Sequence, residues 1–273
     1  QAEASDALAR SGYTLYRDAL RTARDRHGFR FLQPGRVLNP GPRGEPPLLW
    51  FFPLPEGANG ALAALCARRF QAYLDDQRTH FFEPYFQRFH RQAVLVDVLG
   101  ALHAGEAAFA DTADALAAIA AALRNDSWLT RLLGGVNLFG GGPSRVAFVA
   151  TKADHVPERA REALVSLLGD LTGMRGQEGA SHAIAAIRCT EDAVLREEGR
   201  DRAAVRGVLI GNGRGATLDP GEVPLRRPDP VFWSNRFFVM PEFAPPRLDR
   251  TGLSGLPHIG LDVLLRDLVG DLL

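Results

Sequence analysis

Apolar positions follow helical spacing in two long segments near the start of this chain. Residues 1 to 27 carry an apolar side chain every three or four positions, among Arg, Asp and Glu, which predicts an amphipathic helix. Residues 60 to 90 return to the same spacing, and Pro84 is expected to divide them into two helices. Between the two segments, the apolar run from Leu48 to Phe52 predicts a short strand.

Continuous apolar runs of strand length then alternate with helical segments. The runs are Ala93–Asp97, Arg145–Ala150 and Ala183–Ile187, and helical spacing occupies residues 105–124 and 157–171 between them. Such runs are typical of strands that are buried on both faces of a parallel sheet. The alternation therefore predicts an α/β fold with a mostly parallel sheet flanked by helices.

The remaining segments are expected to extend this fold. A helical turn is predicted at Trp128–Leu133, closed by Gly134 and Gly135, and β-like runs at 205–210 and 231–240. Gly211 to Gly215 reads as a loop, and a last helix is predicted from about 259 to 273. We expect one domain over residues 1–273, with a helical insertion at about 60–91 and a C-terminal extension at about 205–273.

Composition narrows the classes of protein. The 273 residues have a formal net charge of zero and are 46% hydrophobic, which argues against a disordered or a nucleic-acid-coating protein. Cys66 and Cys189 lie far apart, so neither a disulfide framework nor a zinc site is indicated and a cytoplasmic location is expected. No apolar run reaches the length of about 18 residues that a transmembrane segment needs.

The first candidate site follows the strand that ends at Val96. Asp97 there can hold Mg²⁺ through a water, and Gly100 lets a backbone N–H approach a terminal phosphate because it has no Cβ. The motif Asp-x-x-Gly is weak by itself. A plain alternative is that Asp97 caps the following segment and Gly100 makes a turn.

The second candidate site is Thr151-Lys152-Ala153-Asp154, which follows the next predicted strand. The carboxylate of Asp154 can accept bonds from N1–H and the N2 amino group of guanine, and adenine offers no matching donors. Lys152 is the only lysine of the chain, at the position where a slim aliphatic stem can lie across the base. The alternative is that Asp154 is the N-cap of the helix that begins at Pro157.

The third candidate site is Arg188-Cys189-Thr190, after the last predicted strand and 34 residues beyond Asp154. A loop at this place in GTPases meets the O6 atom of guanine through backbone N–H groups, so its position matters more than its residue types. Three such sites in this order, each at a strand end, are far more specific than any one of them.

The chain resembles the bacterial YcjX-like family of P-loop GTPases. The residues that carry this resemblance are Leu32–Arg36, Phe51–Pro55, Arg91–Gly105, Ser127–Gly134, Ala150–His155 and Pro245–Leu248. The resemblance implies a G-domain-like P-loop NTPase fold, GTP or GDP with Mg²⁺ as ligands, and a part in bacterial envelope stress. It leaves open a peripheral place at the inner membrane and a stress-response or inner-membrane protein as partner; nucleic acid is not expected.

The chain departs from the pattern of a working GTPase in its phosphate-binding part. The family carries a Gly-x-x-x-x-Gly-Lys-Ser/Thr loop, whereas this sequence contains no Gly-Lys pair, so we expect the first strand and its loop upstream of residue 1. Ala101 stands where small GTPases place a water-orienting glutamine, and His103, Glu106 or Arg91 are the substitutes considered. No switch threonine is identifiable, and the catalytic residue stays unknown.

Two functions therefore remain open from the sequence. The first is a guanine-nucleotide-binding protein that hydrolyses GTP slowly in its complete form. The alternative is a nucleotide-gated scaffold with negligible turnover, which the missing glutamine and threonine favour. An ATPase is disfavoured by Asp154, because adenine lacks the donors that this carboxylate would bind.

Overall fold

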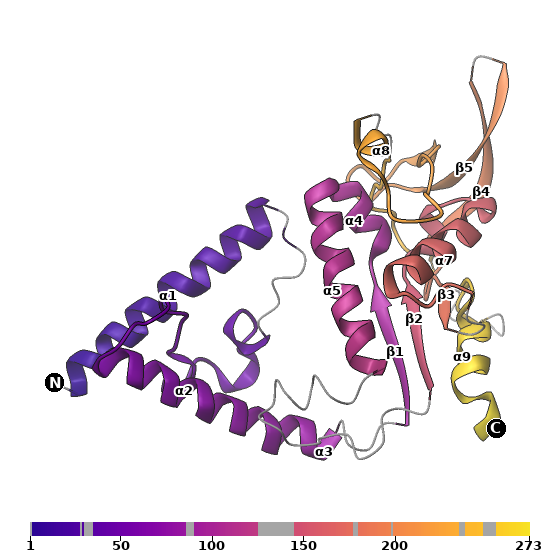
Figure 1. Cartoon of the computed structure of the whole chain (residues 1–273). Helices are drawn as coiled ribbons and strands as arrows, with labels where there is room; N and C mark the ends of the chain where they lie inside the picture. Colours follow the sequence, from indigo (N-terminus) through magenta and orange to yellow (C-terminus); the bar gives the residue numbers. More distant parts are fainter. Residues whose placement is uncertain are drawn as a thin grey trace. The chain divides into compact units, whose positions relative to one another are not determined.

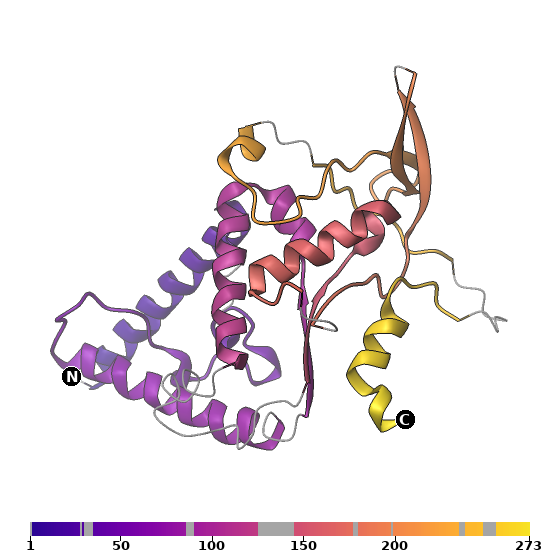
Figure 2. The same cartoon turned by 45° about the vertical axis from the view of Figure 1, so that its right-hand side comes forward.

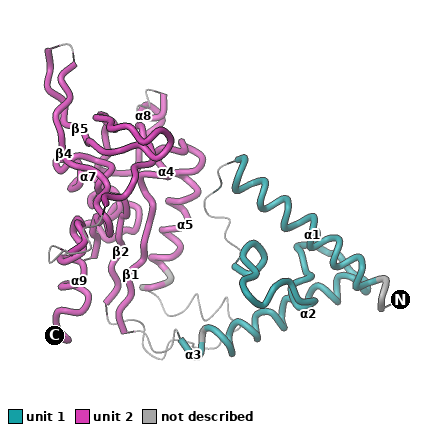
Figure 3. The backbone as a smooth tube through the Cα atoms, turned by 180° about the vertical axis from the view of Figure 1, so that it is seen from behind, with its two compact units in different colours: residues 1–89, 126–141 teal, residues 90–125, 142–273 magenta. Residues whose placement is uncertain are grey.

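The chain is described by a computed structural model. It describes residues 2–27, 29, 35–85, 90–124, 145–176, 180–197, 199–234, 238–247 and 255–273. Two compact units are present, one of residues 1–89 and 126–141 and the other of residues 90–125 and 142–273 (Figure 3). The single domain with a helical insertion remains a prediction. The helical turn predicted at 128–133 and the glycines 134 and 135 that close it lie outside the described residues.

The first unit is built on two long helices. The helix predicted over the first residues is confirmed as α1 (Ala2–His27), and α2 (Ala61–Gln77) packs against it. Three 3₁₀ turns lie between them in the chain: η1 (Gly35–Val37), η2 (Gly41–Arg43) and η3 (Pro47–Leu49). The strand predicted at Leu48–Phe52 is wrong. Pro46 and Pro47 offer no N–H to a strand ladder, and the chain turns there instead.

Pro84 does not divide the second helix as predicted. A π-helical turn, η4 (Arg78–Phe82), follows α2 directly, and α3 (Glu83–Tyr85) continues it through the proline. Proline cannot donate the usual helical hydrogen bond, and a wider turn just before it relieves the clash of its ring with the preceding turn. The helix therefore changes its pitch at η4 and continues through Pro84 to Tyr85.

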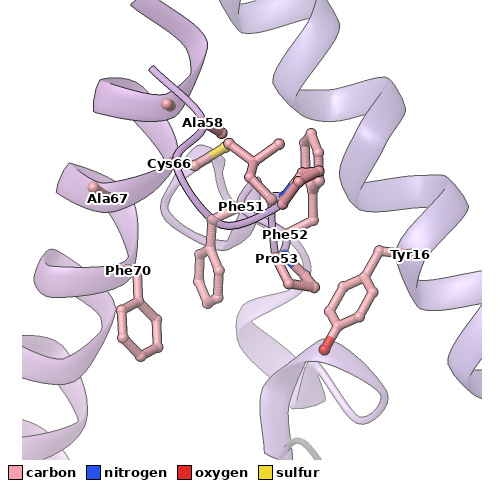
Figure 4. Close-up of a pocket in the computed structure, with 12 residues that line it drawn as sticks. Tyr16, Phe51, Phe52, Pro53, Ala58, Cys66, Ala67 and Phe70 are labelled. Atoms are coloured by element: carbon pink, nitrogen blue, oxygen red, sulfur yellow. The ribbon is translucent and has the colours of Figure 1, made fainter. Parts of the chain in front are cut away.

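An apolar pocket of about 490 Å³ lies within this unit (Figure 4). It is lined by Tyr16 from α1, by aromatic and proline residues of the segment after η3, and by small residues of α2 such as Cys66 and Ala67. The ring of Phe52 comes so close to α1 that a Cβ at Gly12 would lie 2.2 Å from it. Glycine at this position therefore allows the segment to pack against the helix backbone.

The second unit contains the predicted parallel sheet. Its strands are β1 (Arg91–Val96), β2 (Arg145–Ala150) and β3 (Ser181–Ala183), in the order β1-β2-β3, and both pairings are parallel. The third strand begins and ends earlier than the predicted Ala183–Ile187. Val96 pairs with Ala150, which pairs with Ala183, so the three strands end level with one another.

Helices cover the two faces of this sheet (Figures 1 and 2). On one face pack α4 (Val98–Ala104), α5 (Glu106–Arg124) and α7 (Glu158–Thr172), around a core that includes Phe148 and Leu164. On the other face α9 (Leu261–Val269), followed by the 3₁₀ turn η7 (Gly270–Leu272), buries Val149 and Ile184 beneath Leu264 and Leu268.

The prediction that the first strand is buried on both faces is wrong. Val94 and Val96 of β1 face the larger core, but Leu95 is 63% exposed on the side of α9. The core of α9 is built over β2 and does not include any β1 side chain among the described residues. One half of β1 therefore faces outward, and only its other half is packed.

A second sheet extends from the carboxyl side of the first. It is antiparallel and consists of β4 (Thr190–Glu197), β5 (Arg200–Val208) and β6 (Gly215–Leu218), and the hairpin of β4 and β5 projects away from the helices (Figures 1 and 2). The β-like run at 205–210 is confirmed in part by β5, whereas β4 was not predicted. Polar residues alternate with few apolar ones in β4, because most of its side chains face solvent.

The segment at 231–240 differs from its prediction. Residues 230–234 form a short helix, α8 (Pro230–Ser234), and Phe238 makes an isolated bridge with Gly221. Proline at the first helical position favours this start. Throughout the described residues, no helix has the length and apolarity that a membrane crossing requires.

Candidate functional site

The carboxyl ends of the parallel strands bring the three predicted motifs together. Asp97 follows β1 directly, and Thr151 follows β2 directly. Arg188 comes a few residues after β3, at the start of the second sheet. Because the three strands run in the same direction and end level, their following loops share one edge of the sheet.

Asp97 is held by two hydrogen bonds at the end of β1. Its Oδ1 accepts from the N–H of Gly100 at 2.8 Å, which makes it the N-cap of α4. Its Oδ2 lies 2.8 Å from the Nζ of Lys152. A Cβ on Gly100 would stand 2.5 Å from Oδ2, so glycine is needed for the carboxylate to fold over the helix start.

The capping geometry raised as an alternative for Asp97 is therefore present, but Gly100 does not make a turn. It lies inside the first turn of α4, and its φ is not in the left-handed region. A capping carboxylate and a water-mediated Mg²⁺ ligand are compatible, since a carboxylate offers about four acceptor positions. The observed helix cap and the predicted Mg²⁺ ligand are therefore the same carboxylate.

The loop after β2 is fastened to the strands on each side of it. Thr151 donates to the carbonyl oxygen of Val96 through its N–H at 2.9 Å and through its hydroxyl at 3.2 Å. The N–H of Ala153 donates to Ile184 at 3.0 Å. Lys152 lies between these anchors with φ 61°, and of the described residues it is the one non-glycine with a positive φ. The backbone thus turns sharply at the lysine, and its side chain reaches Asp97 across the ends of β1 and β2.

Asp154 is almost completely buried, with 2% of its surface exposed. Its Oδ2 accepts from the N–H of Cys189 at 2.7 Å, and its backbone carbonyl accepts from the hydroxyl of Thr190. The alternative that Asp154 caps the following helix is wrong, because Pro157 occupies the N-cap of α7 and the first N–H of the helix, on Glu158, donates to Asp192. The carboxylate of Asp154 therefore holds the loop at Cys189 and does not cap a helix.

The third motif is held by hydrogen bonds to Asp154, to Pro257 and within the motif itself. Arg188 donates from its N–H to Pro257 at 2.7 Å and from its Nε to the carbonyl of Thr190 at 2.8 Å. The N–H of Cys189 is used by Asp154. The N–H groups of Arg188 and Cys189 are therefore already hydrogen-bonded within the protein. A contact of either one with a nucleotide base requires an exchange of these bonds.

Two ionisable neighbours of Asp154 have shifted titration. Burial, together with the negative charge of Asp154, raises the pKa of the Cys189 thiol. Burial also lowers the pKa of His155 and outweighs the opposite effect of Asp154. The Nδ1 of His155 is buried without a hydrogen-bond partner, and its ring packs at 5.3 Å on Phe243. The thiol and the imidazole are thus both held in their neutral forms beside the buried carboxylate.

The residues considered as substitutes for a water-orienting glutamine are placed differently. Arg91 begins β1 and binds Asp271 at 2.5 Å, roughly 20 Å of extended strand away from Asp97, so this suggestion is wrong. The Nδ1 of His103 lies 3.2 Å from the carbonyl oxygen of Phe238, which occupies the ring in a structural contact. Glu106 is exposed at the start of α5.

Arg161 and Asp192 are further polar residues at this edge, and neither belongs to a predicted motif. They form a two-point ion pair, with N–O distances of 3.0 and 2.9 Å. Arg161 lies one turn into α7, and Asp192 lies in the unpredicted strand β4. No pattern along the sequence could have joined them, because their pairing depends on how the hairpin leaves the sheet.

The carboxylate of Asp97 is suited to a hydrated Mg²⁺ ion. Among the described residues no group of three or more His, Cys, Asp or Glu side chains is gathered as a metal site. Mg²⁺ commonly keeps several waters and takes one or two carboxylates together with phosphate oxygens, so a single carboxylate fits it. Asp97 is about one-third exposed and can meet such a hydrated ion.

Comparison with known proteins assigns the chain to a family. A profile of the YcjX-like family, DUF463, matches residues 1–273. The chain belongs to the YcjX-like family. It is 35% identical over 266 residues to the Ras-like GTPase YcjX of Shewanella oneidensis, an alignment that covers 89% of this chain and 53% of that protein.

A second YcjX relative supports the same assignment. The Ras-like GTPase YcjX of Escherichia coli is 33% identical over 262 residues, which cover 89% of this chain and 55% of the relative. The chain thus spans about half the length of the curated relatives that it matches. The predicted resemblance is confirmed, and the parallel sheet with flanking helices is compatible with the predicted α/β fold.

Proposed function

We propose that this YcjX-like chain supplies the base-reading and Mg²⁺-side residues of a guanine-nucleotide site. The observation that carries the proposal is Asp154, a buried carboxylate at the end of a parallel strand. It keeps acceptor capacity beyond its bond to Cys189, because a carboxylate offers about four acceptor positions. Guanine presents the N1–H and N2 donors that such a carboxylate can bind in pairs.

The other residues have roles that follow from their places. Thr151 anchors the loop, and the stem of Lys152 lies over the base once the ion pair with Asp97 opens. Arg188, Cys189 and Thr190 close the base side through the bonds that hold Asp154. Asp97 holds hydrated Mg²⁺, and the backbone N–H of Gly100 lies beside the terminal phosphate. Bound Mg²⁺ would supply charge neutralisation for the phosphates.

Hydrolysis of GTP is the reaction that we propose for the complete site, and we expect it to be slow. Support comes from two relatives that are named Ras-like GTPases. The phosphate-binding loop that the family pattern requires has no counterpart in these 273 residues, and Ala101 replaces the water-orienting glutamine. Without a positioned water, most of the rate enhancement known for partner-assisted GTPases is missing. A part in bacterial envelope stress, in the cytoplasm or at the inner membrane, belongs to the same proposal.

The second candidate function is a nucleotide-gated interaction module with negligible turnover. It is favoured by the structural contact of His103 with Phe238 and by the distance of Arg91 from Asp97, which remove two candidates for water activation. In this case the nucleotide changes the shape of the loops and a protein partner reads the change. Single-turnover hydrolysis of GTP, measured on protein that includes the phosphate-binding loop, distinguishes the two functions.

Base recognition can be tested on the chain itself. GDP and ADP are titrated to millimolar concentration while the amide resonances of Ala153, Asp154 and Cys189 are followed by NMR. We expect GDP to bind at least about tenfold tighter than ADP, a difference of about 1.4 kcal/mol. Asp154→Asn should remove the preference, and the control Asp201→Asn, on the exposed hairpin, should retain it. Equal binding of both nucleotides, or an unchanged preference in Asp154→Asn, would overturn the proposal.

A further inference from the structure

Asp192 joins three segments of the site although it lies in none of the predicted motifs. Its Oδ1 accepts from the N–H of Glu158, the first residue of α7, at 2.7 Å. The guanidinium of Arg161 reaches both of its oxygens, at 3.0 and 2.9 Å. The guanidinium of Arg188 binds Oδ2 at 2.8 Å. One carboxylate thus accepts four hydrogen bonds from a helix start and two arginines.

Each of these arginines also holds one of the loops that build the base site. The Nε of Arg161 donates to the carbonyl of Ala153 at 3.2 Å, the residue directly before Asp154. The Nε of Arg188 donates to the carbonyl of Thr190 at 2.8 Å, the residue directly after Cys189. Asp192 is therefore connected through Arg161 to Ala153 and through Arg188 to Thr190. These two residues flank the hydrogen bond between Asp154 and Cys189.

The chemistry of the group suits this connecting position. Arginine presents its N–H donors in a planar fork, so a guanidinium that binds a carboxylate and a carbonyl together has little freedom to rotate. Bonds between ionised partners are stronger than neutral ones. The four acceptor positions of the carboxylate are filled by these donors, and an asparagine, with one oxygen and an NH₂ group that donates, cannot replace them.

We propose that Asp192, acting through Arg161 and Arg188, is a positioning residue that sets the guanine selectivity of the site. This inference rests on the proposed function, since it assigns to Asp154 the reading of guanine. A paired contact between a carboxylate and two base donors depends on the direction of the carboxylate. The bond from the N–H of Cys189 fixes that direction, and the Asp192 cluster fixes where this N–H and the backbone of Asp154 stand relative to each other.

The same cluster connects the start of the hairpin to the loop that contains Asp154. Thr190, at the first position of β4, donates to the carbonyl of Asp154, and Asp192 lies two residues further along the strand. The first residues of the hairpin and the loop that contains Asp154 thus form one hydrogen-bonded assembly. A change at Asp192 acts on Asp154 through this assembly and touches neither the nucleotide nor Mg²⁺.

The test compares GDP with inosine diphosphate, which lacks the exocyclic N2 amino group and so reports on one half of the paired contact. Affinities are measured by NMR titration for the wild type, Asp192→Asn and the control Glu191→Gln. Glu191 is adjacent to Asp192 in β4, is exposed, and is paired with Arg206 of the neighbouring strand β5. We expect a preference for GDP of about tenfold in the wild type and the control, and of about threefold or less in Asp192→Asn.

A double variant separates positioning from a merely structural role. If Asp192 acts through Asp154, Asp192→Asn should leave the GDP-to-inosine ratio unchanged in an Asp154→Asn background. A structural role would instead weaken both nucleotides in proportion and keep the wild-type ratio in the single variant. Thermal unfolding of each variant shows that the comparison is made on folded protein. If Asp192→Asn does not fold, Arg161→Gln and Arg188→Gln each remove one connection and are expected to lower the ratio.

The outcomes distinguish the two proposals. If the wild type prefers GDP and Asp154→Asn abolishes this preference, base reading by Asp154 stands. A full preference in Asp192→Asn, or in both arginine variants, then overturns the positioning role alone. If the wild type shows no preference for GDP over ADP or inosine diphosphate, base reading fails and the role of Asp192 fails with it.

Discussion

The ammonium of Lys152 lies 2.8 Å from the Oδ2 of Asp97, across the ends of two neighbouring parallel strands. This pair connects the motif proposed for Mg²⁺ to the motif proposed for guanine. Both side chains are partly exposed, at 47% and 35%, so the pair contributes at most about 1 kcal/mol to stability. Because each partner is assigned to a different part of the nucleotide, we expect the pair to open when a nucleotide binds.

The left-handed backbone at Lys152 can be tested with two substitutions that both remove the ammonium. Glycine adopts φ 61° without strain, whereas the β-branched valine is strongly disfavoured there. We expect Lys152→Val to be less stable than Lys152→Gly by about 1–2 kcal/mol in urea unfolding. Both should lose affinity for GDP, since neither has a stem to lie over the base. Equal stability of the two variants would show that the loop relaxes at this position.

Gly100 should tolerate no side chain while Asp97 keeps its present position. In Gly100→Ala the new methyl group would meet the Asp97 carboxylate at 2.5 Å and displace it from the N–H that it caps. Loss of the cap costs about 1 kcal/mol in thermal or urea unfolding. The matched control is Gly211→Ala, where an added Cβ meets nothing within 4 Å and stability should stay within about 0.5 kcal/mol. A stable Gly100→Ala protein would show that the cap is dispensable.

Cys189 reports on the charge of Asp154. Burial and the negative carboxylate raise the pKa of this thiol, so little thiolate is present at neutral pH and alkylation by iodoacetamide should be slow. Asp154→Asn removes the charge and should speed the alkylation severalfold, as measured by mass spectrometry. Cys66, the other cysteine, is buried. Folded Cys189→Ser protein should therefore stay unlabelled and serves as the control. An unchanged rate in Asp154→Asn would contradict the coupling of the two groups.

Asp192 should make the stability of the chain depend on acid pH. Burial acts to raise its pKa, but the N–H of Glu158 and the guanidinium of Arg161 outweigh burial and lower the pKa below its ordinary value. A carboxyl whose pKa is lower in the folded state stabilises the fold fully above its unfolded pKa of about 4, and this contribution disappears as pH falls through the folded value. Urea unfolding between pH 2 and 7 should therefore show a smaller loss of stability at low pH for Asp192→Asn than for the wild type.

The expected difference between these two proteins at pH 7 is about 1–2 kcal/mol, because hydrogen bonds to a charged group are lost at a site that is about one-third exposed. Asp201→Asn is the control, since this carboxylate lies 3.9 Å from Arg196 on the exposed hairpin. It should follow the wild type at every pH. Parallel curves for the wild type and Asp192→Asn would contradict the role assigned to the cluster in stability.

Several elements could be predicted from the sequence because their patterns are local. Helix α1 shows apolar positions at helical spacing, and strand β2 is a continuous apolar run because both of its faces are packed. Predictions from the local pattern are wrong where the packing of distant segments decides which side chains are buried. Leu95 belongs to an apolar run but is exposed, because the core beneath α9 includes side chains of β2 and, among the described residues, none of β1. The strand β4 has few apolar residues and projects into solvent, so no periodic pattern marked it.

The residue types of the candidate site and their order can be read along the chain: an acid and a glycine after one strand, the only lysine and an acid after the next, and a loop after the third. The folded chain adds the contacts between these residues: Lys152 meets Asp97, Asp154 is buried against the N–H of Cys189, and Asp192 binds both arginines. Motifs at strand ends depend on neighbours in the chain, which a sequence displays directly. Contacts between loops depend on strand order and on the path of the hairpin, and these are set by the packing of segments that lie tens of residues apart.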